Sequence, residues 1–224
     1  MNADPAPLPR ILILASGNGT NLQALIDASR ERDFPGQVVA VGCNRPGAFA
    51  LERAAQANID TFVVDHKKYD SREEFDGALM AEIRRHNPDL VVLAGFMRIL
   101  TTDFVRALRG SLLNIHPSLL PRYTGLNTHQ RALEAGDEVH GVSVHFVTEE
   151  LDGGPVIAQA EVTVDPDDTA ESLAQKVQLK EHLLYPIVVR WFCEGRIQLG
   201  SDYVLFDGEL LRKPMRLPDE RVTH

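Results

Sequence analysis

The hydrophobic and polar positions of the chain form two kinds of alternating segment. Helix-like segments have apolar positions three and four residues apart, as at Leu22, Leu25 and Ile26. Between them lie short, nearly continuous apolar runs of the kind found in buried parallel strands: residues 11–15, 38–43, 61–64, 90–94 and 112–115. This alternation predicts an α/β fold with a doubly wound, mostly parallel, Rossmann-like sheet.

Local signals place two of the helices more closely. One is expected over residues 48–57. Another begins at Ser71, because Glu74 follows three residues later in the capping-box arrangement, and it ends near Asn87 and Pro88.

The pattern changes after residue 140. Val142, Val144 and Phe146 alternate with other residues, which predicts a strand, and residues 156–160 and 161–164 predict further extended structure. A long helix over residues 169–193 and a hairpin at Asp207-Gly208 are expected to complete the chain. No repeat or linker interrupts this order, so residues 11–224 are interpreted as a single domain after a flexible tail at residues 1–10.

Composition narrows the class of protein. The 224 residues are 44% hydrophobic and 25% charged, with a net charge of −9. These values are typical of a globular domain, and the negative charge argues against a broad nucleic-acid surface. A small anionic substrate is still compatible with this net charge, because backbone N–H groups can bind phosphate. No signal peptide or membrane-spanning run is evident, so we expect a cytoplasmic protein without a membrane partner.

Three polar side chains suggest catalytic chemistry. Asn114 and His116 lie two residues apart on a predicted strand, so they share a face where the chain turns at Pro117. An amide and an imidazole can stabilise an oxyanion, and the imidazole can also move a proton. Asp152, in the turn at residues 151–155, is the natural carboxylate partner. A metal site including His116, His129, His145 and Asp152 is a weaker alternative, because no two of these residues have the usual ligand spacing.

A glycine-rich loop at residues 17–22 follows the first strand and opens a helix, which is typical of an anion site. A dinucleotide site would need a third glycine at Leu22 and an acid near Cys43-Asn44, and a nucleoside triphosphatase would need a lysine in the loop. We therefore favour the phosphate of a substrate over NAD, with a plain tight turn as the remaining alternative.

These motifs together resemble those of the folate-dependent formyltransferases, and in particular the branch that formylates glycinamide ribonucleotide. The resemblance rests on residues 114–121 and 151–155, with residues 16–21, 95–100 and 141–147 in matching order. It extends from about residue 10 to about residue 195.

The resemblance implies a role for each matching residue. The catalytic residues would be Asn114, His116 and Asp152. The ribotide would be bound by Gly19, Thr20, Asn21, Leu22, Gln178, Lys180 and Glu181. The folate would contact Arg72, Met97, Arg98, Ile99, Leu100, Asn114, Val147, Thr148, Glu149, Glu150, Leu151 and Asp152.

The implied reaction moves the formyl group of 10-formyltetrahydrofolate to the amine of glycinamide ribonucleotide, a step of de novo purine biosynthesis. No metal, nucleic acid or covalent enzyme intermediate is expected, and a weak homodimer is left open.

Three alternatives remain. Formylation of initiator tRNA normally needs a further C-terminal domain, and hydrolysis of the folate normally needs an N-terminal regulatory domain. A ligand-binding module without catalysis would make the three polar residues incidental.

Overall fold

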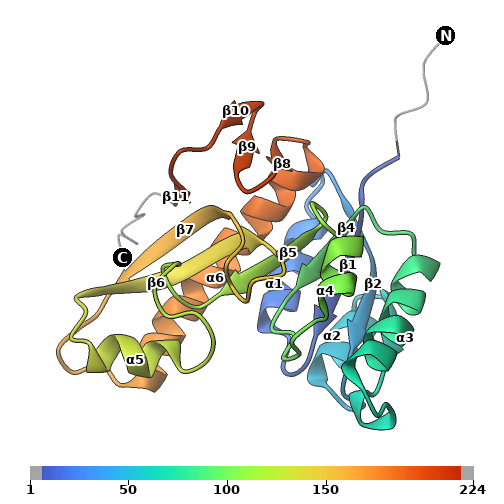
Figure 1. The fold of residues 1–224 in the computed structure, drawn as a ribbon, viewed down its shortest axis with the longest axis horizontal. Coiled ribbons are helices and arrows are strands. Elements are labelled where there is room, and N and C mark those ends of the chain that lie inside the picture. The colour runs from blue at the N-terminus through green and yellow to red at the C-terminus, as the bar shows by residue number, and fades with distance from the viewer. Residues whose placement is uncertain (1–6, 218–224) are drawn as a thin grey trace.

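The apolar runs form the middle of an eight-stranded sheet in the computed structural model, which describes residues 7–217 (Figure 1). The strand order is β11-β7-β6-β5-β4-β1-β2-β3. Strands β1 to β5 pair in parallel, as predicted, whereas β6 runs antiparallel to β5 and to β7. The strands are β1 (Arg10–Ala15), β2 (Gln37–Cys43), β3 (Asp60–Val63), β4 (Leu90–Leu93), β5 (Leu112–His116), β6 (Val139–Phe146), β7 (Val156–Thr163) and β11 (Met215–Arg216).

Helices cover both faces of this sheet. They are α1 (Thr20–Ser29), α2 (Phe49–Gln56), α3 (Arg72–Arg85), α4 (Thr102–Ala107), α5 (Thr128–Glu134) and α6 (Ala170–Cys193), with a short 3₁₀ turn, η1, at His66–Lys68. Side chains of β1 alternate between the two resulting cores. Ile11 and Ile13 pack with α1, α2 and α6, and Leu12 and Leu14 pack with α3 and α4.

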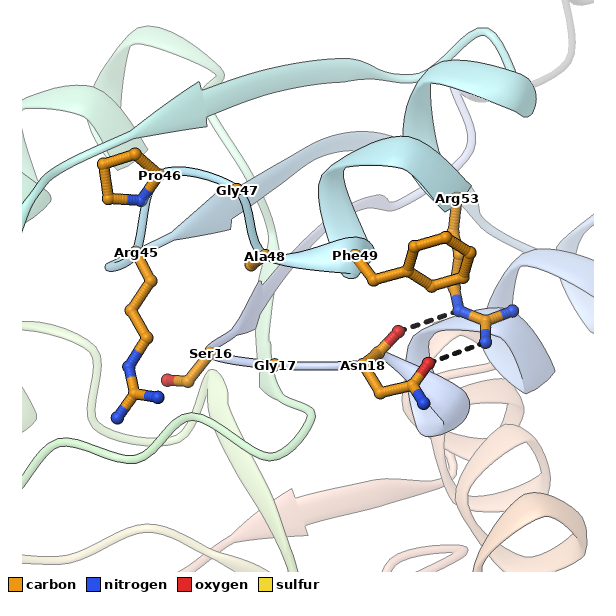
Figure 2. A pocket seen from close by; sticks show the side chains of 9 residues that line it. All are labelled: Ser16, Gly17, Asn18, Arg45, Pro46, Gly47, Ala48, Phe49 and Arg53. Carbon is orange, nitrogen blue, oxygen red and sulfur yellow. Dashed lines mark hydrogen bonds between the residues drawn. The ribbon is translucent and has the colours of Figure 1, made fainter.

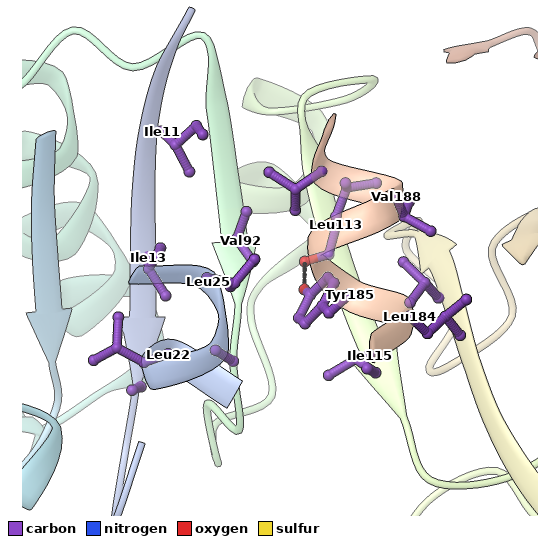
Figure 3. Packing of buried hydrophobic residues seen from close by; sticks show 14 of the residues in the cluster. Ile11, Ile13, Leu22, Leu25, Val92, Leu113, Ile115, Leu184, Tyr185 and Val188 are labelled. Carbon is purple, nitrogen blue, oxygen red and sulfur yellow. Dashed lines mark hydrogen bonds between the residues drawn. The ribbon is translucent and has the colours of Figure 1, made fainter. Parts of the chain in front are cut away.

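Helix α6 packs across the strands at the centre of the molecule. Figure 3 shows Tyr185 of α6 among the buried side chains beside β5. Its hydroxyl oxygen lies 2.9 Å from the Leu93 carbonyl oxygen and 3.2 Å from that of Leu113, and its side chain is fully buried. A buried hydroxyl must find such partners, so these contacts help to hold α6 against β4 and β5.

Most predicted elements are confirmed, with differences at their ends. The two extended segments expected over residues 156–164 form one strand, β7. Helices α4 and α5 and strands β8 (Ile197–Leu199) and β11 were not predicted from the sequence. The expected hairpin is present as β9 (Val204–Phe206) and β10 (Glu209–Leu210).

The N-terminus of α3 differs from the predicted capping box. The Glu74 N–H donates to the Ser71 hydroxyl (3.1 Å), as expected, but the Glu74 carboxylate accepts from the N–H of Asp70. Part of the predicted tail, residues 1–6, lies outside the described residues, and Arg10 already belongs to β1. None of the described helices is both long and apolar enough to cross a membrane.

The strand order reverses between β1 and β4, which are neighbours in the sheet although two strands separate them in the chain. In such sheets, ligands bind at the carboxyl ends of the strands beside this reversal. The loops after β1 and β4 meet here, because the Ser16 N–H donates to the Gly95 carbonyl (3.2 Å) and the Met97 N–H donates to the Ser16 hydroxyl (2.7 Å). A ligand site is therefore expected at this edge of the sheet.

Candidate active site

Asn114 and His116 lie at the carboxyl end of β5, which adjoins β4 at this edge. The pleat projects both side chains to the same side of the strand, as predicted. Asn114 is half-buried and His116 is 6% exposed. A polar pair held this far from water interacts more strongly with a developing charge than an exposed pair would.

The two ring nitrogens of His116 have different neighbours. Nε2 lies 2.8 Å from the carbonyl oxygen of Tyr123, which can only accept, so Nε2 carries a proton. Nδ1 lies 3.5 Å from Oδ2 of Asp152. This distance is long for a hydrogen bond but close for an ion pair when Nδ1 is also protonated. The predicted pairing of His116 with Asp152 is therefore consistent with the geometry.

Asp152 is held in place by the turn that carries it. Its backbone has φ 51°, and its Oδ2 accepts a hydrogen bond from the Gly125 N–H (2.8 Å). Two residues later, a Cβ on Gly154 would lie 1.8 Å from the Phe146 carbonyl oxygen, so only glycine fits there. The side chain of Asp152 is 8% exposed. The Gly-Gly turn seen in the sequence thus brings a largely buried carboxylate beside the histidine.

His145 is a neighbour of this group that the sequence analysis did not assign to it. It faces Asn114 across the β5–β6 pair, and its Nε2 lies 3.3 Å from the Asn114 amide nitrogen. Burial lowers the pKa of His145, and its Nδ1 lies 2.9 Å from the Phe146 carbonyl oxygen. The neutral ring therefore donates from Nδ1 and accepts the Asn114 N–H at Nε2, which orients the amide and leaves its second N–H for a ligand.

The glycine-rich loop forms the start of α1. Gly19 is the N-cap residue with φ 75°, and no side chain caps the helix. A Cβ at Gly19 would lie 2.8 Å from the Cβ of Ala50, so α2 also requires glycine there. Thr20 accepts a hydrogen bond from the Gln178 amide (3.2 Å), which brings α6 to the loop. Leu22 is fully buried in the core, so only its backbone is available to a ligand.

Glu181 of α6 also reaches this loop. The Asn21 amide donates to the Glu181 carboxylate (2.7 Å), and burial raises the pKa of that carboxyl group. The other amide atom, Asn21 Oδ1, is buried without a partner among the described residues. Lys180 is half-buried on the same helix. The ribotide residues expected from two distant segments are thus brought together by the packing of α1 against α6.

Two loops that the resemblance assigns to the folate carry exposed apolar side chains. Met97 is 63% exposed and Ile99 is 58% exposed in the loop after β4, and Leu151 is 56% exposed in the loop after β6. Exposed apolar side chains that flank polar groups are typical of a binding site for a flat organic ligand. The remaining residues of the second loop include Glu149, whose carboxylate accepts from Arg106 of α4 (2.8 Å).

Helix α3 supports the first of these loops. Its Asp76 carboxylate accepts from the Thr101 N–H (2.6 Å), and the Arg98 guanidinium carbon lies 5.5 Å from the centre of the Phe75 ring. Arg72 lies in the first turn of α3 and is exposed. Arg72 and Arg98 are therefore carried by one local unit, and neither side chain forms a hydrogen bond or ion pair with Asn114, His116 or Asp152.

A second pair of histidines lies near the loop that follows β5. His129 Nδ1 and His140 Nε2 are 3.2 Å apart, and burial lowers the pKa of His140 to about 4. Among the described residues, no group of three or more His, Cys, Asp or Glu is placed to hold a metal ion. His129, one member of the alternative metal set, thus pairs with His140.

Comparisons with known proteins agree with this geometry. The sequence model named Formyl transferase matches residues 9–189. Phosphoribosylglycinamide formyltransferase of Escherichia coli is 53% identical over 90% of this chain and 95% of its own length. The human trifunctional purine biosynthetic protein adenosine-3 is 44% identical over 86% of this chain but only 19% of its own length. The structure of phosphoribosylglycinamide formyltransferase from Coxiella burnetii superimposes with a TM-score of 0.90 at 47% identity, covering 95% of this chain and 100% of the other.

Proposed function

The chain belongs to the formyl transferase family, and we propose that it transfers the formyl group of 10-formyltetrahydrofolate to the amine of glycinamide ribonucleotide. One observation supports the proposal: the fold pairs His116 with Asp152, and the same chain carries a glycine-rich helix start without a side-chain cap and two loops with exposed apolar side chains. The helix start suits a ribotide phosphate and the two loops suit the flat ring of a folate. The enzyme therefore produces formylglycinamide ribonucleotide in purine biosynthesis.

Asn114 stabilises the transition state in this proposal. Attack of the amine on the formyl carbon develops negative charge on the formyl oxygen. The Asn114 amide is oriented by His145, so one N–H is already committed and the other is ready to donate to that oxygen. A donor that is oriented beforehand needs no reorganisation during the reaction.

His116 and Asp152 handle charge and protons in the same step. A proton on Nδ1 would make the ring an imidazolium whose charge faces the Asp152 carboxylate 3.5 Å away. The ring stabilises the oxyanion with Asn114, and Asp152 holds the ring and helps, through water, to carry the proton from the attacking amine to the leaving nitrogen of the folate. No covalent bond to the protein is needed.

The ribotide and the folate bind to two different sets of residues in this proposal. Gly19 to Leu22, Gln178, Lys180 and Glu181 bind the ribotide, with Glu181 accepting from its amine or sugar hydroxyls. The folate contacts the loops at residues 95–100 and 147–152, together with Arg72. The hydrogen bonds of Gln178 and Glu181 to the α1 loop and the exposure of Met97, Ile99 and Leu151 support this arrangement.

The acceptor is tested by supplying 10-formyltetrahydrofolate with one of three acceptors: glycinamide ribonucleotide, initiator tRNA or water alone. Release of tetrahydrofolate is followed in each case. We expect turnover that depends on glycinamide ribonucleotide. Turnover with tRNA, or at the same rate with water alone, would replace the proposal with one of the two related activities.

Asn114→Ala tests the role of the oxyanion donor. Removing one such donor typically costs ~100- to 1,000-fold in kcat, and we expect a loss in that range with little change in either KM. The thermal unfolding midpoint serves as the control, because a half-buried side chain at a strand end contributes little packing. Near-normal kcat in the folded variant would remove Asn114 from the mechanism.

A further inference from the structure

A cavity of about 220 Å³ lies between the loop after β1 and the loop after β4, and it includes the proposed phosphate loop. Among the described residues that line it, Arg45 alone carries a charge. Arg45 comes from the loop after β2, which the sequence analysis did not assign to any site. The same residue also lines the adjoining groove, of about 550 Å³, which continues toward α2.

The loop that carries Arg45 is fastened to the phosphate loop. The Ala48 N–H donates to the Arg45 carbonyl (3.3 Å), which closes a tight turn, and the Ala50 N–H donates to the Gly17 carbonyl (3.1 Å). Figure 2 shows the Arg45 side chain extending from this turn so that its guanidinium lies beside Ser16. The arginine is therefore directed along the cavity by backbone contacts.

The two arginines near the cavity, Arg45 and Arg53, differ in whether their guanidinium N–H groups have hydrogen-bond partners. Arg53 donates to the Asn18 carbonyl and side-chain oxygens, both at 2.8 Å (Figure 2). It also donates to the Gln23 amide oxygen at 3.2 Å. The Arg45 guanidinium has no hydrogen-bond or ion-pair partner within residues 7–217. Arg53 thus braces the loop, whereas the guanidinium of Arg45 has its donors available for a ligand.

A phosphate bound in this cavity would need a full positive charge beside it. The Glu181 carboxyl group is bonded to Asn21, and any negative charge on it would repel a phosphate on the same loop. Backbone N–H groups at the start of α1 carry only partial positive charge, and Lys180, the other cation of the proposed ribotide site, does not line this cavity. Asn21 lines the cavity and is 9% exposed, with its Oδ1 lacking a partner among the described residues, so this wall also has an unused buried acceptor for a hydroxyl group.

We propose that Arg45 is a further substrate-binding residue, whose guanidinium binds the ribotide phosphate across the cavity from the start of α1. The inference rests on the proposed function, because it assumes that the phosphate loop binds a phosphorylated sugar. Arginine suits this task, since its fork of N–H donors matches phosphate oxygens and it stays charged. Arg45 binds the phosphate equally in the ground state and the transition state. Removing it should therefore raise KM for the ribotide and leave kcat unchanged.

Arg45→Gln removes the charge and keeps a polar side chain of similar reach. Hydrogen bonds to charged groups typically contribute enough that we expect the KM for glycinamide ribonucleotide to rise roughly 10- to 100-fold. The kcat and the KM for the folate should stay within about twofold, the pattern of lost uniform binding. Arg45→Lys keeps the charge and should recover most of the affinity. Arg32→Gln, which removes an exposed cation after the end of α1, is the matched control.

Inorganic phosphate provides a readout that does not depend on the reaction. It should bind the wild-type protein in calorimetric titration and bind Arg45→Gln at least about tenfold more weakly, with Arg32→Gln like wild type. Equal phosphate affinity and equal ribotide KM in wild type and Arg45→Gln would overturn the inference. If the wild-type enzyme formylates glycinamide ribonucleotide, such a result leaves the proposed function standing; if it does not, the proposed function itself has failed.

Discussion

At the scale of single residues, the most informative contact is that between His116 and Asp152. The ring donates from Nε2 to the Tyr123 carbonyl, and Nδ1 lies 3.5 Å from the carboxylate. Asp152→Asn keeps the shape of the side chain but removes its charge, so the imidazolium form loses its partner. We expect kcat at neutral pH to fall ~100- to 10,000-fold, the range for general acid–base groups, and the acidic limb of the pH–rate profile to change shape.

A double-mutant cycle checks whether these two residues act together. His116→Ala should cost about as much as Asp152→Asn, and the double variant should lose little beyond either single variant, because residues that act as a unit are not additive. Asp207→Asn is the control, since it also removes the charge of a paired aspartate, but Asp207 pairs with Arg196 in the C-terminal hairpin and contacts neither His116 nor Tyr123. Losses that add in the cycle would show that the two residues work independently.

At the scale of elements, two separate constraints require glycine at position 19, the N-cap of α1. Gly19 has φ 75°, and a Cβ there would meet Ala50 of α2 at 2.8 Å. Gly19→Ala would therefore strain the backbone, at about 1–2 kcal/mol, and push the phosphate loop away from α2. We expect the dissociation constant of the ribotide to rise while that of the folate changes little, as measured by separate titrations.

Gly136→Ala is the matched control for that experiment. Gly136 also has a positive φ, 69°, but nothing lies within 4 Å of an added Cβ, and the residue follows α5, outside the phosphate loop. The variant should bind both ligands like wild type. An equal loss for both ligands in Gly19→Ala would mean that the loop only supports the fold.

At the scale of the whole molecule, buried histidines make stability depend on pH. Burial lowers the pKa of His140 from 6.5 to about 4, so below pH 6.5 the unfolded chain binds a proton that the folded chain does not. The stabilisation is therefore complete above about pH 6.5 and is lost as the pH falls toward 4. Between pH 7 and pH 5, this one group should remove about 2 kcal/mol of unfolding free energy.

Denaturant unfolding at pH 7, 6 and 5 measures this contribution. His140→Gln should lose less stability than wild type over that interval, by about 2 kcal/mol. His129→Gln should show the same sign, because burial also lowers the pKa of His129. If the unfolding free energies of wild type and His140→Gln fall by the same amount between pH 7 and pH 5, His140 is not held neutral by the fold.

Several features of the fold could be predicted from the chain because they are local. The buried strands were evident as apolar runs, and β4 is buried along its whole length. The hairpin at Asp207-Gly208 is confirmed, with φ 52° and 84° at the two residues. Helices α4 and α5 were not predicted, since they have six and seven residues and show too few turns for a clear periodicity. The strand β11 is two residues long and depends on pairing with β7.

By itself, the sequence determined which polar groups stand at the end of one strand and in one turn. Asn114, His116 and Asp152 could be singled out as catalytic candidates because periodicity and turn residues are properties of neighbouring positions. Only the tertiary structure decided which distant residues meet them. The antiparallel pairing of β5 with β6 sets His145 against Asn114, and the packing of α2 beside α1 directs Arg45 toward the phosphate loop. Such contacts join residues from separate segments of the chain, and they form only once hydrophobic burial has packed helices and strands into one body.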